Sequence, residues 1–367
     1  IVKVDARHPD NVYAAGGEAI AKARAGEGPT ILWCDLDRLG SHTSSDDHRV
    51  YRDLKDIEEM QQRDPIRLFA EELIASGELT EDTWKQIQDE VVALVDSDYL
   101  KAEKDQDPLA SEVSLHAFGE PVAATKPPIQ GGQKMTMVSA INQTFRKALE
   151  NDPKVIFFGE DIEDPKGGVF GMTKGLSEAF PNQVFNSPLA ECTIVGTAVG
   201  MAATGYKPVF EMQFIDFISP AWNQLVTNIS TLRWRTFGDW KCPLTLYAPY
   251  GAYLPGGSLW HSMSNEGMLA HVTGIKIAIP STPEDAAGIF WTAIHGDDPT
   301  IILVPKHIFR KNVEVGAVEP LPFGKARVHR AGSAATIVTW GAMVDRAAQA
   351  AEGLDCEILD LRTIVPW

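Results

Sequence analysis

The sequence is poor in cysteine and has no long apolar run, and both shortages narrow what the chain can be. Its 367 residues hold only four cysteines, which lie far apart and form no Cys-x-x-Cys pair. A disulfide framework or a cysteine-based zinc site is therefore not expected, and a reducing, cytoplasmic (bacterial) location fits this usage. No apolar run reaches the roughly 18–20 residues that cross a bilayer, so no membrane partner is expected.

Basic residues are scarce as well. The chain has 33 lysines and arginines against 50 acidic residues, a formal charge of −17. No segment clusters the basic residues strongly, which argues against nucleic acid as a partner. The acidic balance favours solubility and attraction to a basic protein partner.

Both ends of the sequence read as interrupted. It begins without Met at IVKVD, which is typical of a strand, and it stops at CEILDLRTIVPW, another strand and loop. We therefore expect a fragment of a longer polypeptide, with a length that suits two or three domains.

The first part of the chain alternates a strand, a helix and a strand. These elements are expected at residues 1–5, 11–26 and 30–36, followed by a polar loop over 41–53. Two amphipathic helices are predicted between residues 64 and 103, with Pro65 at an early helical position. Residues 117–134 are rich in Pro, Gly and Ala, which is typical of a linker.

The second part alternates short apolar runs with helical patterns. Strands are expected at 154–160, 208–214, 243–249, 275–281 and 300–306, and helices at about 136–150, 191–204, 217–236 and 283–295. Nearly continuous apolar strands separated by helices predict an α/β fold with doubly wound parallel sheets. A strand at 334–341, a helix and a strand at 356–361 indicate the opening of a further α/β domain. The predicted domains are 1–116, the linker 117–134, 135–315 and 316–367.

One acid stands at the start of a predicted helix of small and apolar residues. Glu191 follows Pro188 in NSPLAECTIVGTAVG, and Gly196 and Gly200 lie four apart on one helix face. An acid in a first turn can simply complement the helix dipole. The functional alternative is a poorly hydrated carboxylate that exchanges a proton with a bound group.

Other candidates follow predicted strands, where doubly wound sheets bind ligands. Gln213 and Phe217 lie four apart in FEMQFIDF, and His261 ends a Gly-rich loop. Taken singly, Phe217 is also compatible with core packing and His261 with an inert loop residue. The polar loop RLGSHTSSDD carries candidates that suit an anion, but it has no GxxxxGK[ST] or GxGxxG pattern. These are Arg38, Ser41, His42 and Thr43.

Taken in order, these motifs resemble a known family. The stretches 159–176, 186–225 and 256–286 resemble the β subunit of the E1 component of 2-oxoacid dehydrogenases, which are thiamin-diphosphate enzymes. Residues 4–53 with DPI at 64–66 resemble the later half of the α subunit. The chain therefore resembles a fused E1 component, closer to the branched-chain (2-oxoisovalerate) type through GSHTSSDD and LWHSMSNE.

The resemblance implies a role for each matching residue. Glu191 would contact N1′ of the aminopyrimidine and act in catalysis with His42 and His261. Phe217 would stack on the pyrimidine, and Leu189 and Gln213 would line its pocket. Arg38, Ser41 and His42 would lie at the diphosphate side, and His261 would help transfer the acyl group to a lipoyl arm.

The resemblance also implies partners, and the sequence departs from the family pattern at some positions. It implies a 2-oxoacid substrate, a lipoylated E2 acyltransferase and a homodimer that is α2β2-like at full length. Mg²⁺ ligands are expected upstream of residue 1, so no metal ligand is assigned. Ser41 stands in place of a second histidine, Thr43 in place of a phosphorylated serine, and Asp37 in place of a tyrosine.

Other functions stay open from the sequence. Within the family, pyruvate or acetoin could be the substrate. Another transketolase-like thiamin-diphosphate enzyme is a second reading, and an assembly piece without catalysis is a third.

Overall fold

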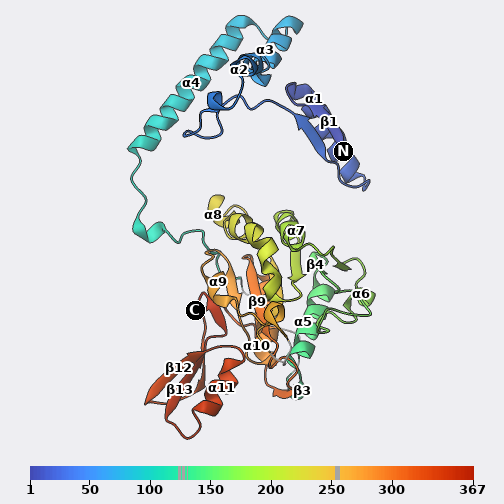
Figure 1. Cartoon of the computed structure of the whole chain (residues 1–367), viewed down its shortest axis with the longest axis vertical. Coiled ribbons are helices and arrows are strands. Elements are labelled where there is room, and N and C mark those ends of the chain that lie inside the picture. Colours follow the sequence, from blue (N-terminus) through green and yellow to red (C-terminus); the bar gives the residue numbers. More distant parts are fainter. Residues whose placement is uncertain (123–124, 126–128, 130, 253–256) are drawn as a thin grey trace. The chain divides into compact units, whose positions relative to one another are not determined.

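The chain divides into two compact units (Figure 1). In the computed structural model, unit 1 is Ile1–Asp107 and unit 2 is Pro108–Trp367. The structure describes residues 1–122, 125, 129, 131–252 and 257–367. Part of the predicted linker (123–124, 126–128 and 130) and part of the Gly-rich loop (253–256) lie outside the described residues.

Unit 1 begins with the predicted strand–helix–strand order. β1 (Val2–Asp5) and β2 (Leu32–Asp35) pair in parallel, and α1 (Pro9–Arg24) connects them. Helices α2 (Leu54–Gln61), α3 (Pro65–Ser76) and α4 (Glu81–Lys104) follow, of which α2 was not predicted. The Asp64 side chain accepts the backbone N–H of Ile66 and so caps α3 before Pro65.

Unit 2 is built on a seven-stranded sheet with the order β14-β8-β9-β7-β6-β4-β5. Its strands are β4 (Val155–Gly159), β5 (Val184–Asn186), β6 (Lys207–Glu211), β7 (Thr245–Tyr250), β8 (Lys276–Ala278), β9 (Thr300–Pro305) and β14 (Thr363–Val365). All neighbours pair in parallel except β14, which lies antiparallel to β8 at the edge. The predicted α/β class with a parallel sheet is confirmed.

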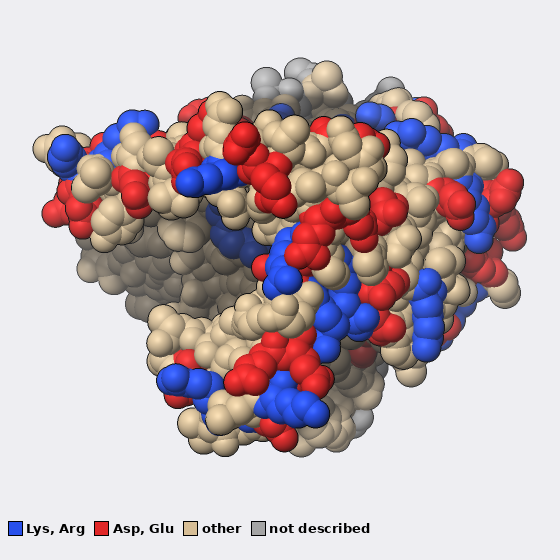
Figure 2. All heavy atoms as spheres, turned by 90° about the horizontal axis from the view of Figure 1, so that it is seen from above, with Lys and Arg blue, Asp and Glu red and all other residues tan. Residues whose placement is uncertain are grey.

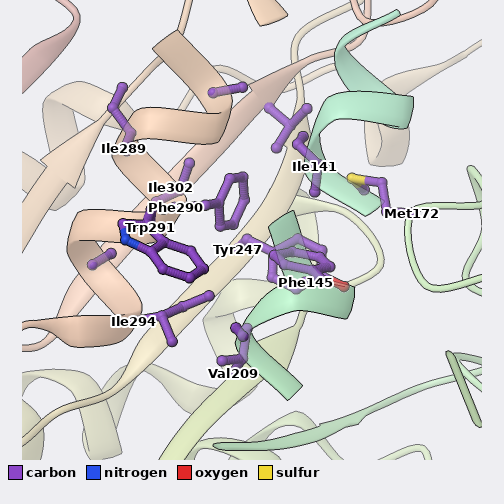
Figure 3. Packing of buried hydrophobic residues seen from close by; sticks show 14 of the residues in the cluster. Ile141, Phe145, Met172, Val209, Tyr247, Ile289, Phe290, Trp291, Ile294 and Ile302 are labelled. Atoms are coloured by element: carbon purple, nitrogen blue, oxygen red, sulfur yellow. The ribbon is translucent and has the colours of Figure 1, made fainter. Parts of the chain in front are cut away.

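Helices cover both faces of this sheet because alternate strand residues point to opposite sides. One core joins Val209 to α5 (Met137–Asn151) and α10 (Pro283–His295), and Figure 3 shows its aromatic centre around Phe145, Tyr247 and Phe290. The other core joins the next residue, Phe210, to α7 (Glu191–Ala203) and to the helical turns after β6. The strands are therefore buried on both faces, as their continuous apolar runs require.

The helix predicted over 217–236 is wrong as a single element. The segment forms a 3₁₀ stretch η3 (Ile215–Ala221), a π stretch η4 (Gln224–Ile229) and the short α8 (Leu232–Arg235). Pro220 lies inside η3 and cannot donate a backbone hydrogen bond. Thr227 and Thr231 donate hydroxyl hydrogen bonds to the carbonyls of Asn223 and Thr227, which compete with a regular ladder.

Two smaller sheets complete unit 2. β3 (Gln133–Met135) pairs antiparallel with β10 (Val313–Val315). β11 (Arg327–Arg330), β13 (Cys356–Asp360) and β12 (Ala335–Thr339) form the third sheet, beside α11 (Met343–Ala350). Short helices are η2 (Ala110–Glu112), α6 (Leu176–Ala179), η5 (Leu259–His261) and α9 (Glu266–Ala270) in unit 2, and η1 (His48–Val50) in unit 1.

The start of the predicted linker is anchored by a buried acid. Asp298 is 3% exposed and accepts the backbone N–H of Gly119 at 2.9 and 3.0 Å. The same carboxylate pairs with Arg233 at 2.9 Å and with Lys276 at 2.8 Å. The backbone of Gly119 is thus held by a buried carboxylate that two cationic side chains also bind.

Figure 2 shows acidic and basic side chains interspersed over the face in view. Among the described helices, none combines the length and the apolar character that a membrane span requires.

Candidate active site

The candidate site lies at the carboxyl edge of the seven-stranded sheet. Glu160 follows β4, Gln213 and Phe217 follow β6, and Lys306 follows β9. Because these strands are parallel, the residues after them emerge at the same edge. Glu191 is the first residue of α7, the helix that comes after β5. The sheet therefore brings four chain segments that are distant in sequence to one edge.

Glu191 begins α7 without a side-chain cap ahead of it. Ala190 occupies the capping position and has no side chain that could accept a hydrogen bond. Glu191 is the acid of the first turn. The side chain is partly exposed, and among the described residues none forms a hydrogen bond or an ion pair with it. The carboxylate complements the helix dipole and is still free to bind an outside group. Both readings of Glu191 made from the sequence are compatible with this placement.

Glu160 is the acid whose charge interacts with that of Glu191. Burial, together with the negative charges of Glu191 and Asp161, raises the pKa of Glu160 to about 7. Its side chain is 5% exposed, and its Oε1 atom has no hydrogen-bond partner among the described residues. A carboxyl group with this pKa exchanges protons near neutral pH.

A second buried acid lies at the end of β6. Glu211 is 1% exposed and accepts the hydroxyl of Tyr247 at 2.6 Å. Burial raises the pKa of Glu211 to about 7, against the effect of that hydrogen bond. Close by in the chain, Gln213 donates its side-chain amide to Asp161 at 3.2 Å. The predicted residue Gln213 is thus linked to the acidic group that includes Glu160.

Phe217 and His261 come together through their rings. Their centroids lie 5.7 Å apart at an interplanar angle of 89°. Phe214 lies closer to His261, at 4.5 Å and 87°. Phe217 is partly buried and His261 is exposed, so an aromatic face and an imidazole are both accessible at this edge.

The main chain beside His261 is held by two residues that the sequence reasoning missed. Asp216 accepts the backbone N–H groups of Ser262 and Met263, and Lys306 donates to the carbonyl of His261. Lys306 directly follows β9, and Asp216 lies in η3, the first helical stretch after β6. These positions were the available signal, since polar residues that follow a buried parallel strand face the ligand edge. Glu160, which follows β4, was missed for the same reason.

Leu189 stands apart from these contacts. Its side chain is 80% exposed, two residues before Glu191. The structure leaves it available to a ligand or to another chain.

In unit 1, the candidate residues share one loop. Arg38 donates to the hydroxyl of Tyr51 at 2.7 Å, and Tyr51 donates to Asp46 at 2.8 Å. Asp46 also accepts the backbone N–H of His42 at 2.7 Å. The hydroxyl of Ser41 accepts the backbone N–H of His48 at 3.3 Å. The loop is thus tied together internally, with the imidazole of His42 exposed.

Asp37 forms ion pairs that connect two segments of the same unit. It pairs with Arg7 at 3.1 Å and with Arg63 at 2.9 Å. The hydrogen bond and charge of Arg63, followed by the charge of Arg7, hold the pKa of Asp37 below its usual value. An acid at this position therefore links the end of α2 to the strand–helix–strand start of the unit.

The residues at the sheet edge fit the pyrimidine end of thiamin diphosphate. Glu191 is a carboxylate without a protein partner among the described residues, and Glu160 carries a buried oxygen that lacks one. The partly exposed ring of Phe217 can stack on a flat heterocycle.

Comparisons with known domains agree with this arrangement. Residues 1–111 match the family described as the dehydrogenase E1 component, and residues 133–311 match the transketolase pyrimidine binding domain. Residues 324–367 match the transketolase C-terminal domain. A solved structure titled "Split gene transketolase, inactive beta4 tetramer" matches with a TM-score of 0.52 and 20% identity, over 63% of this chain and 72% of that one. The fold and the matched domains define a transketolase-like, thiamin-diphosphate type of protein.

Relatives in sequence narrow this class. The 2-oxoisovalerate dehydrogenase subunit beta 2 of Arabidopsis thaliana is 41% identical over 65% of this chain and 68% of its own length. The corresponding beta subunit of Bacillus subtilis is 42% identical, over 63% and 73%. The pyruvate dehydrogenase E1 component subunit beta of Leifsonia xyli is 41% identical, over 64% and 71%. This chain belongs to the family of 2-oxoacid dehydrogenase E1 components.

Proposed function

We propose that the protein is the E1 decarboxylase of a 2-oxoacid dehydrogenase complex, with a branched-chain 2-oxoacid as substrate. The observation that carries the proposal is the pair of acids at the sheet edge, Glu191 at the start of α7 and Glu160 after β4. One is open to a ligand, and the other is buried with a pKa near neutrality. Such a pair suits the repeated proton exchange that this chemistry requires.

Thiamin diphosphate, when bound, supplies the electron sink that lets a 2-oxoacid lose carbon dioxide. Glu191 would hydrogen-bond N1′ of the aminopyrimidine and share a proton with it. Glu160, whose pKa is about 7, would be a second acid near Glu191 that exchanges protons at neutral pH. Phe217 would stack on the pyrimidine, and Gln213 and Leu189 would line its pocket.

His261 would act in the transfer of the acyl group to a lipoyl disulfide on the E2 partner. As the acyl carbon forms its bond to one sulfur, the S–S bond breaks and the two electrons reduce the disulfide. The departing sulfur takes up a proton, which the exposed imidazole of His261 can donate. His42, Arg38 and Ser41 of unit 1 would bind the diphosphate and substrate side in an α2β2-like homodimer. Mg²⁺ would accompany the diphosphate, and we assign none of the described residues to it.

Relatives named for both substrates leave pyruvate as the second candidate, since the identities are 41% and 42% for the 2-oxoisovalerate enzymes and 41% for the pyruvate enzyme. The unit 1 loop over 41–47 and the segment 259–266 favour the branched-chain type through their resemblance to that group. The test compares 3-methyl-2-oxobutanoate with pyruvate in the natural full-length protein supplied with thiamin diphosphate and Mg²⁺. We expect the higher kcat/KM with 3-methyl-2-oxobutanoate. A clear preference for pyruvate would overturn the branched-chain assignment, and inactivity with every 2-oxoacid would favour the assembly role.

A further inference from the structure

Two buried side chains of opposite charge hold one peptide group. The N–H of Ser262 donates to Asp216 Oδ1 at 2.9 Å, and the carbonyl of the same peptide, that of His261, accepts Lys306 Nζ at 2.5 Å. The next N–H, that of Met263, also donates to Asp216 Oδ1, at 3.0 Å. Both polar ends of the His261–Ser262 peptide are therefore bound, one by Asp216 in η3 and the other by Lys306, which directly follows β9.

The burial of these two charges is unusual for a loop contact. Lys306 is 2% exposed and Asp216 is 5% exposed. Removing an ammonium and a carboxylate from water is unfavourable, and apolar residues of similar size would be tolerated at least as well for stability alone. The ammonium also lies 4.6 Å from the centroid of Phe214, which offsets part of its lost hydration. A positional requirement on the bound peptide is the simplest reason for keeping both charges.

The same cluster fixes the imidazole of His261. Phe214, which lies beneath the ammonium of Lys306, contacts the His261 ring edge-to-face at 4.5 Å. Asp216 stands between Phe214 and Phe217 in sequence. One short segment therefore accepts the backbone N–H groups that follow His261 and packs against its ring. Burial lowers the pKa of Lys306, and the charge of Asp216 opposes that shift. Asp216 thus favours the protonated form that the hydrogen bond to His261 uses.

We propose that Asp216 and Lys306 are positioning residues that together fix the His261–Ser262 peptide and so aim the imidazole of His261 at the acyl acceptor. The inference rests on the proposed function, in which His261 assists acyl transfer to a lipoyl group. It predicts that these two residues affect the transfer step more than decarboxylation. A small misplacement of a reacting group can lower a rate by about a hundredfold.

The experiment measures two half-reactions of the full-length protein. Decarboxylation is followed with an artificial electron-accepting dye, and acyl transfer with an isolated lipoyl domain. In K306M we expect the ratio of acyl transfer to decarboxylation to fall by about tenfold or more. The double variant D216N/K306M, which leaves neither charge unpaired, should show the same selective loss and carries the test if K306M does not fold. The matched control is K311M, since the side chain of Lys311 is exposed and pairs with the exposed Asp345 at 2.7 Å.

A parallel H261A variant tests the role of His261 in acyl transfer separately from the positioning role of Asp216 and Lys306. If H261A lowers the ratio while K306M and the double variant keep the wild-type ratio, the positioning role is wrong and the proposed function stands. If H261A itself leaves the ratio unchanged, the role of His261 in the proposed function is wrong. An equal loss of both half-reactions in K306M and the double variant would indicate a purely structural role and overturn the inference.

Discussion

Glu160 and Glu191 interact through their charges across two segments of the sheet edge, and this interaction adds to burial in raising the pKa of Glu160 to about 7. The two acids come from different elements, the end of β4 and the start of α7. Neither alone is an unusual residue. Together they combine a buried acid that exchanges protons near neutral pH, Glu160, with a partly exposed carboxylate that a ligand can reach, Glu191.

The first prediction concerns this pair. In E191Q, decarboxylation should fall by about 10²–10⁴-fold, which is the usual contribution of a positioned acid or base. The pKa of Glu160 should also move down toward its ordinary value, because one of the charges that raise it is removed. Steady-state rates test the first effect, and ¹³C NMR titration of the glutamate carboxyl carbons tests the second.

The matched control is E178Q, because Glu178 lies exposed on α6 and is not among the residues whose charges raise the pKa of Glu160. It should change neither the rate nor the titration of Glu160. Decarboxylation at the wild-type rate in E191Q would remove Glu191 from the mechanism.

The second prediction concerns pH and the buried acid Glu211. Its pKa is raised from 4.5 to about 7 in the folded protein, so the folded state binds the proton more tightly than the unfolded state. The stabilisation is complete below pH 4.5 and is lost as the pH rises through about 7. For this group the loss amounts to at most about 3 kcal/mol in the free energy of unfolding.

The variant E211Q keeps an acceptor for the Tyr247 hydroxyl and removes the titrating group. Its free energy of unfolding, measured with urea at pH 5 and pH 8, should therefore fall less over this interval than that of the wild type. Equal falls in the two proteins would show that Glu211 does not titrate in this range.

The third prediction concerns the buried acid that anchors residue 119. In D298N, Arg233 and Lys276 lose their shared counter-charge, and their side chains are only 12% and 16% exposed. Breaking a buried pair from one side costs about 3–5 kcal/mol. We expect a loss of that size in urea unfolding.

The neighbouring acid offers the control. Asp297 pairs with Lys241, whose side chain is 59% exposed, and D297N should cost less than about 1 kcal/mol. If D298N and D297N lost the same small amount, the buried cluster around residue 119 would contribute little to stability.

The sequence predicted the strands that are buried on both faces, because their apolar runs are long and uninterrupted. The strands β4, β6, β7 and β9 lie where the runs at 154–160, 208–214, 243–249 and 300–306 indicated. The short β5 and β14 were missed, since three residues carry too little pattern to be recognised. The prediction of one long helix after β6 failed because hydroxyl groups and Pro220 interrupt the regular pattern of backbone hydrogen bonds.

For the site, the sequence indicated which segments meet but not which polar residues become buried there. Phe217 and His261 are in contact, and Glu191 opens α7 as predicted. The burial of Glu160, Asp216 and Lys306 depends on how neighbouring segments close over them, which a local pattern does not contain. Their roles, like those of the residues predicted from the resemblance, stay predictions until the variants are measured.

The antiparallel edge strand β14 has a mechanical consequence. It comes directly after β13 of the third sheet in the chain. Its residues Thr363 and Val365 pair with Ala278 and Ile277 of β8, so the chain passes from the third sheet into the seven-stranded sheet. The third sheet cannot rotate away from the seven-stranded sheet without breaking the backbone hydrogen bonds between β14 and β8. We therefore expect the third sheet and the seven-stranded sheet to move together.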